Sequence, residues 1–245
     1  MSIEIYPNPE ELSKAAVQLF VDVARQSVKE RGRFTAALSG GGSPQRMYEM
    51  LASEPFKSRV PWDETFIFWG DERFVPSDDP ENNARMTREK LLDHVPLPSD
   101  HIFPIPTSGK PKAAATTYAS TLSSFFGNSN DFPRFDFMLL GLGENGHTAS
   151  LFPETDVLQE QNKLVDSVFI EEKDQYRITL TYPVINSARN IVFLVHGSSK
   201  SSVLQKILEG KYEPNELPAQ LIKPSSSELF WLIDENAAAI LERAD

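Results

Sequence analysis

The sequence predicts an α/β fold in which a doubly wound, mostly parallel sheet carries helices on both faces. Short apolar runs rich in β-branched and aromatic residues alternate along the chain with longer amphipathic stretches. This alternation is typical of a parallel sheet whose two faces are covered by helices. A hydrophobic content of 40% is enough for a sizeable core, and glycine, proline and N-cap residues mark several boundaries.

The predicted elements follow one another in a regular order. A first helix is predicted from apolar residues that share one helical face, namely Leu12, Ala15, Ala16, Leu19 and Val23. Strands are predicted at 34–39, 65–69, 135–140, 177–182, 190–196 and 228–233. Further helices are predicted at 44–52, 80–92, 111–125 and 199–208.

Local signals set some of the helix ends. Ser43-Pro44 and Asp79-Pro80 each read as an N-cap followed by proline at the first helical position, and Gly210 reads as a helix end. The proline-rich stretch 96–111 is the best linker candidate, but it is too short to separate two cores. We therefore expect a single Rossmann-like domain over residues 1–245.

The composition excludes several classes of partner. The chain has 24 Lys and Arg against 35 Asp and Glu, and the resulting net charge of −11 repels nucleic acid and anionic membranes. An anionic ligand would need a local basic pocket. Cysteine is absent, which excludes disulfides, thiolate metal sites and a cysteine nucleophile. The first residues lack the features of a signal peptide, and no apolar stretch reaches the roughly 20 residues of a membrane span, so we expect a cytoplasmic protein.

The segment 141–153 is the most informative for function. The apolar run before it ends at Gly141, and Gly143 and Gly146 then precede His147. Glycines let a backbone approach a ligand closely, and ligands of open α/β sheets bind just beyond the carboxyl ends of strands. The alternative is a glycine-rich turn followed by a histidine that only caps a helix.

Other charged or glycine-rich segments follow predicted strands. Segment 39–44 contains three consecutive glycines before a predicted helix, where free backbone N–H groups attract an anion such as phosphate. Asp71, Glu72 and Arg73 follow the strand at 65–69, although such clusters are common on surfaces. Arg177 and Lys200 could complete a phosphate cradle, or they could be ordinary solvated side chains.

Taken together, these segments resemble the 6-phosphogluconolactonases, which share a superfamily with the glucosamine-6-phosphate deaminases and isomerases. The similarity extends almost from end to end of the chain. It is carried by segments 39–44, 69–73, 80–86, 141–153, 177–181, 195–200 and 230–234. The resemblance implies hydrolysis of 6-phospho-D-glucono-1,5-lactone to 6-phosphogluconate, the second step of the oxidative pentose phosphate pathway, without a metal or an organic cofactor.

Ester hydrolysis needs a base for water and a group that stabilises the oxyanion. His147 is the only nearby group that is neutral and basic at pH 7, so we assign it the role of general base. The resemblance implies that Arg73 stabilises the developing charge and that Asp71 and Glu72 orient Arg73. It also implies a set of substrate-binding residues, namely Gly41, Gly42, Ser43, Glu72, Asn83, Gly146, Arg177 and Lys200. Arg46 is left outside the site.

The chain departs from the family at one position. The family loop usually reads Asp-Gly-His, whereas this chain has Asn145-Gly146-His147. An amide oxygen still accepts a hydrogen bond from the imidazole, but without charge assistance. We therefore count Asn145 among the catalytic group.

Two other functions stay open at this stage. Deaminases of the superfamily carry an aspartate two positions before the histidine and a glutamate five positions after it, where this chain has Asn145 and Phe152. A non-catalytic sugar-phosphate-binding protein is the other alternative. We expect the partner to be a small molecule and the chain to be a monomer or weak homodimer. We also expect Ser43, Arg73, His147, Arg177 and Lys200 to line one cleft.

Overall fold

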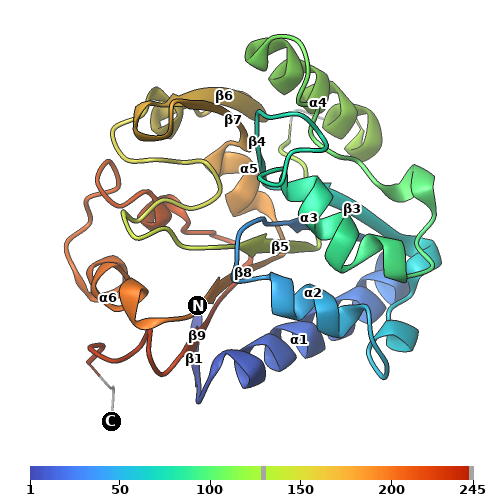
Figure 1. Cartoon of the computed structure of the whole chain (residues 1–245), viewed down its shortest axis with the longest axis horizontal. Helices are drawn as coiled ribbons and strands as arrows, with labels where there is room; N and C mark the ends of the chain where they lie inside the picture. Colours follow the sequence, from blue (N-terminus) through green and yellow to red (C-terminus); the bar gives the residue numbers. More distant parts are fainter. Residues whose placement is uncertain (128–130, 243–245) are drawn as a thin grey trace.

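A six-stranded parallel sheet forms the centre of the molecule (Figure 1). The computed structural model describes residues 1–127 and 131–242. From edge to edge, the strands are β1 (Ser2–Tyr6), β9 (Glu228–Asp234), β8 (Asn190–Val195), β5 (Phe137–Leu140), β2 (Phe34–Leu38) and β3 (Thr65–Trp69). Every neighbouring pair is parallel, which confirms the predicted fold class.

The strand order reverses direction between β2 and β5. From β2 the chain moves outward to β3, then returns to the other side of β2 as β5 and continues through β8 to β9. The sheet is therefore doubly wound, and the loops that leave β2 and β5 diverge at the reversal. Ligands of doubly wound sheets bind at this point, outside the carboxyl ends of the strands.

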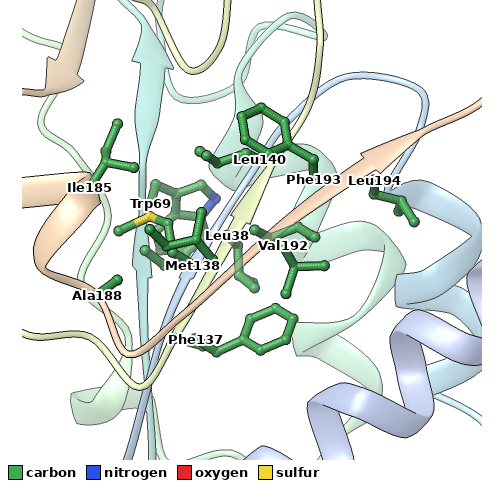
Figure 2. Packing of buried hydrophobic residues seen from close by; sticks show 14 of the residues in the cluster. Leu38, Trp69, Phe137, Met138, Leu140, Ile185, Ala188, Val192, Phe193 and Leu194 are labelled. Carbon is green, nitrogen blue, oxygen red and sulfur yellow. The ribbon is translucent and has the colours of Figure 1, made fainter. Parts of the chain in front are cut away.

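Two long helices cover opposite faces of the sheet. Phe20 of α1 (Pro9–Arg31) packs against Phe34 and Phe137 at ring distances of 5.0 and 5.2 Å. Phe125 of α4 (Pro111–Phe126) packs against Phe68 at 5.1 Å. Ala36 pairs with Phe137 while its neighbour Ala37 pairs with Phe68, so these contacts lie on opposite faces. Figure 2 shows Phe137 pointing away from Met138, the next residue of β5.

The remaining helices are short. They are α2 (Gln45–Leu51), α3 (Asn83–Lys90), α5 (Tyr182–Ser187) and α6 (Ser201–Glu209). In Figure 1, α2 lies beside α1 at the lower right, and α4 lies apart from both at the upper right. Among the described residues, no helix has both the length and the apolar composition needed to cross a membrane.

A second, three-stranded antiparallel sheet lies beside the first. It consists of β4 (Asp71–Arg73), β7 (Gln175–Leu180) and β6 (Val165–Ile170). The strand predicted at 177–182 is present as β7, but it pairs antiparallel in this second sheet and not with the parallel strands. The chain leaves the parallel sheet at Gly70, whose carbonyl accepts from Leu180 N, and β4 continues into an antiparallel pairing with β7. The pattern of 177–182 predicts a strand but contains no information about its partner.

Two predicted helix starts are also wrong. α2 begins at Gln45, and neither Ser43 nor Pro44 gives it a side-chain cap. α3 begins at Asn83, where the Asn82 side chain accepts from Arg85 N at 2.8 Å. Asp79 instead accepts from Glu81 N within a preceding turn, because an Asx side chain stabilises turns as readily as helix starts.

Other predicted boundaries agree with the structure. Gly210 does follow the end of α6. The proline-rich stretch 96–111 packs on the sheet, where Phe103 stacks on Phe68 at 4.6 Å. The single domain over 1–245 stays a prediction.

Candidate active site

The site loops leave neighbouring parallel strands at one edge of the sheet. The glycine loop 39–44 follows β2, and the loop containing His147 follows β5, its neighbour. The turn containing Lys200 follows β8, which pairs with the other side of β5. Arg73 lies on β4, just beyond β3. The carboxyl ends of parallel strands share one edge, so the topology gathers segments that are far apart in the sequence.

The His147 imidazole is held from three directions. Its Nδ1 lies 2.6 Å from Asn145 Oδ1, and because an amide oxygen only accepts, Nδ1 carries the proton. One ring face stacks on Phe152 with a centroid distance of 3.9 Å and an interplanar angle of 13°. The other neighbour is Gly143, where an added Cβ would lie only 2.0 Å from Nδ1. These contacts leave Nε2 as the nitrogen available to a substrate.

The surroundings keep His147 neutral. Burial is the largest effect that lowers its pKa, followed by the positive charges of Arg177, Lys200 and Arg73, and the pKa falls to about 3. The imidazole is thus unprotonated at neutral pH. Three of the predicted cations lie close enough to His147 to act on it.

Arg73 and Arg177 face each other across β4 and β7. Arg73 Nη1 donates to the carbonyl of Glu81 at 2.8 Å. Arg177 is only 9% exposed, and its Nε has no hydrogen-bond partner. Burial and the neighbouring Arg73 charge lower the pKa of Arg177. Within the part of the chain that the structure describes, no carboxylate forms an ion pair with either arginine. Two adjacent cations of this kind favour an anionic ligand.

The carboxylates of Asp71 and Glu72 do not orient the Arg73 guanidinium, so that prediction is wrong. Asp71 accepts from Ser150 Oγ at 2.6 Å. Glu72 is fully buried and accepts from the backbone N–H groups of Arg73, Asn83 and Ala84 at 2.7 to 2.9 Å. Burial raises the pKa of Glu72 to about 7. Glu72 therefore holds the start of α3, where unpaired N–H groups attract a carboxylate.

Asn83 lies against the glycine loop. Its Nδ2 donates to the carbonyl of Asp71 at 3.0 Å, while its buried Oδ1 has no partner. A Cβ on Gly40 would lie 1.8 Å from that oxygen, so only glycine fits there. Gly41 has φ of +85°, a conformation that favours glycine. Arg46 points elsewhere and pairs with Glu10 at 2.7 Å, consistent with its place outside the site.

The remaining predicted residues lie on the same loops. Gly42 and Ser43 precede α2, and Gly146, at φ of +81°, precedes His147. Lys200 Nζ lies 3.7 Å from Glu144 Oε1. No group of three or more His, Asp or Glu side chains that could hold a metal occurs within residues 1–127 and 131–242.

Sequence reasoning missed three residues that shape the site. Gly143 and Phe152 enclose the imidazole, and Ser150 binds Asp71. All three lie in the recognised segment 141–153. The i and i+5 spacing of His147 and Phe152 contains no sign of stacking, because it depends on a turn with Ala149 at φ of +47°.

A neutral imidazole beside two arginines without a carboxylate partner among the described residues, at the reversal of a doubly wound sheet, is suited to proton transfer next to a bound anion. The chain belongs to the family described as glucosamine-6-phosphate isomerases/6-phosphogluconolactonase, which matches residues 7–231. A 6-phosphogluconolactonase of Synechocystis sp. is 41% identical over 238 residues, which covers 96% of both chains. One from Nostoc sp. is 37% identical over 243 residues, with 98% of both chains covered.

A solved structure is similar along almost the whole chain. The 6-phosphogluconolactonase from Trypanosoma brucei superposes with a TM-score of 0.84 at 30% identity and 98% coverage of both chains. The recognised family and the predicted fold are therefore confirmed.

Proposed function

We propose that the chain hydrolyses 6-phospho-D-glucono-1,5-lactone to 6-phosphogluconate, as the second step of the oxidative pentose phosphate pathway. Relatives of nearly the same length that carry the name 6-phosphogluconolactonase support the reaction. The observation that carries the proposal is a neutral His147 whose Nε2 is free, beside Arg73 and Arg177, which pair with no carboxylate among the described residues.

In the proposed reaction, His147 activates water. Nε2 accepts a proton as the water oxygen attacks the lactone carbonyl, and the tetrahedral intermediate carries a negative charge on the former carbonyl oxygen. Arg73 stabilises that charge. The intermediate then collapses, the bond from C1 to the ring oxygen breaks, and the imidazolium returns its proton to that oxygen. Asn145 keeps Nδ1 protonated throughout, which leaves Nε2 as the reacting atom.

The substrate phosphate is held by the backbone of Gly41, Gly42 and Ser43 with the side chains of Arg177 and Lys200. A base with a pKa of about 3 accepts a proton poorly. A bound phosphate dianion offsets the positive charges that lower this pKa, so the bound substrate makes His147 a stronger base. Phosphate binding and base strength are thus coupled.

The isomerase alternative has less support from the site. Phe152 occupies the position of the deaminase glutamate, and a phenylalanine ring cannot transfer a proton. We also propose that the protein is cytoplasmic and acts as one domain, as a monomer or weak homodimer. Its net charge of −11 opposes binding to nucleic acid or to an anionic membrane.

The direct test is to form the lactone in place with a sugar-phosphate dehydrogenase and follow its disappearance. The protein should accelerate this loss beyond spontaneous hydrolysis, and His147→Ala should lower the rate by about 10²–10⁴-fold. His94→Ala is the matched control, because His94 is an exposed histidine away from the site. No acceleration at micromolar protein would refute the lactonase function, and a His147→Ala rate within about threefold of wild type would exclude the base role, since such a base contributes far more.

A further inference from the structure

The imidazole of His147 lies in a narrow slot. The Phe152 ring stacks on it at 3.9 Å, almost in parallel. A Cβ on Gly143 would lie within 2.0 and 2.1 Å of two imidazole atoms, so the ring lies directly against the Gly143 backbone. The His147 side chain therefore has little freedom to rotate.

The backbone builds this slot from a tight turn. Leu151 N donates to Thr148 O at 2.9 Å, and Ala149 adopts φ of +47°. The turn folds the chain back so that Phe152 returns to His147. A left-handed conformation at a residue other than glycine costs free energy, and such strain is concentrated at functional sites.

Phe152 also lines a large cavity. It encloses about 1180 Å³, and its described lining includes Phe152 and Asn145 but not His147. Phe152 is only 7% exposed and touches both the imidazole and the cavity, so its ring forms part of the wall between them. The same cavity is lined by carboxylates, among them Glu154, Glu171 and Glu172.

We propose that Phe152 is a positioning residue of the reaction, which holds the His147 imidazole against Gly143 and shields it from the water and carboxylates of the adjacent cavity. The role deepens the proposed lactonase function and rests on it for the catalytic consequence. The shielding of His147 from the cavity is a property of the protein without substrate, so it does not depend on the lactonase function.

The charged groups around the imidazole determine the sign of the expected effect. Arg177 on β7, Lys200 after β8, Arg73 on β4 and Lys173 before β7 all lower the pKa of His147, after the larger effect of burial. Without the Phe152 ring, water would reach the His147 imidazole. The negative charges of the cavity carboxylates would also act on the imidazole more strongly. Both changes stabilise the imidazolium, so the pKa should rise.

The test compares Phe152→Ala with Phe152→Leu in the full chain. Phe152→Ala should lower kcat about 10- to 100-fold with KM nearly unchanged, because the base is misplaced while the phosphate site is intact. The pKa of His147, followed by NMR without substrate, should rise. Phe152→Leu keeps an apolar wall and should recover most of both properties.

Phe169→Ala is the matched control. Phe169 lines the same cavity but is 40% exposed and packs on Tyr176 rather than on His147. It should leave kcat and the His147 pKa unchanged.

The outcomes separate the two parts of the proposal. An unchanged His147 pKa in a folded Phe152→Ala protein would overturn the shield. An equal loss of kcat in Phe152→Ala and Phe169→Ala would overturn the positioning role. If Phe152→Ala does not fold, the Phe152→Leu variant decides. A His147 pKa and a kcat close to wild type support the proposal, a raised pKa contradicts the apolar wall, and a low kcat at wild-type pKa contradicts the expected recovery of positioning by leucine. The NMR comparison remains valid even if the wild-type chain does not hydrolyse the lactone, so failure of the function is recognised separately.

Discussion

Two clusters of cations lie at opposite edges of the parallel sheet and differ in how their charge is compensated. At the amino edge, Arg31 and Arg189 approach the buried carboxylate of Asp136 at 3.0 and 3.3 Å. We call these three residues the amino-edge cluster. At the carboxyl edge, Arg73, Arg177 and Lys200 surround the neutral imidazole of His147. We call these four the carboxyl-edge cluster.

The difference indicates which cluster supports the fold and which binds a ligand. Asp136 also accepts hydrogen bonds from Thr35 N and Oγ1, so its carboxylate has all of these partners within the protein. At the carboxyl edge, Asp71 on β4 accepts from Ser150 Oγ and pairs with neither Arg73 nor Arg177. Lys200 pairs with Glu144, whose side chain is 66% exposed, a type of contact that contributes little. The positive charge of the carboxyl-edge cluster is therefore poorly neutralised by the described residues and can bind an anion.

The largest effect is expected from Asp136→Ala. It removes the anion between two arginines and both bonds to Thr35, which should lower the free energy of unfolding by about 3 kcal/mol. The value lies at the lower end of the range for buried pairs because Arg31 and Arg189 are 31% and 35% exposed. Urea denaturation measures it. Activity per folded molecule should not change, and a loss of activity without a loss of stability would contradict the comparison.

The next effect concerns the other cluster. Arg177→Met removes an arginine with an unpartnered Nε and should weaken 6-phosphogluconate binding by about 1.5–3 kcal/mol, the range for hydrogen bonds to charged groups. Calorimetric titration measures this, and unphosphorylated gluconolactone serves as the ligand control. Arg31→Met in the amino-edge cluster should leave 6-phosphogluconate affinity unchanged. Equal losses for both ligands would mean that Arg177 supports the fold rather than phosphate binding.

The smallest effect is expected from Asn145→Asp. A carboxylate 2.6 Å from Nδ1 would stabilise the imidazolium, so the pKa of His147 should rise and activity should be equal or higher. NMR titration of the imidazole and the lactone assay measure the two quantities. If the pKa does not move, the two side chains are not coupled.

Local patterns predicted five of the six parallel strands, all except β1, and the loops that follow β2 and β5. Glycines in these loops mark positions where the backbone adopts a conformation that favours glycine, such as φ of +85° at Gly41. Partners that are distant in the sequence could not be predicted. Nothing local indicates that Arg177 lies opposite Arg73, or that Glu72 holds the start of α3 instead of orienting Arg73. The structure brings the predicted cations close to His147, whereas the roles of the site residues stay predictions.

The central claim is that the cations of the carboxyl-edge cluster bind the substrate phosphate and control the base strength of His147. The most direct measurement is an NMR titration of the His147 imidazole with and without saturating 6-phosphogluconate. In the free protein the pKa should be near 3, because burial and four nearby cations oppose protonation. With the ligand bound, its phosphate should offset the cations and raise the pKa. An unchanged pKa in the complex would contradict the account.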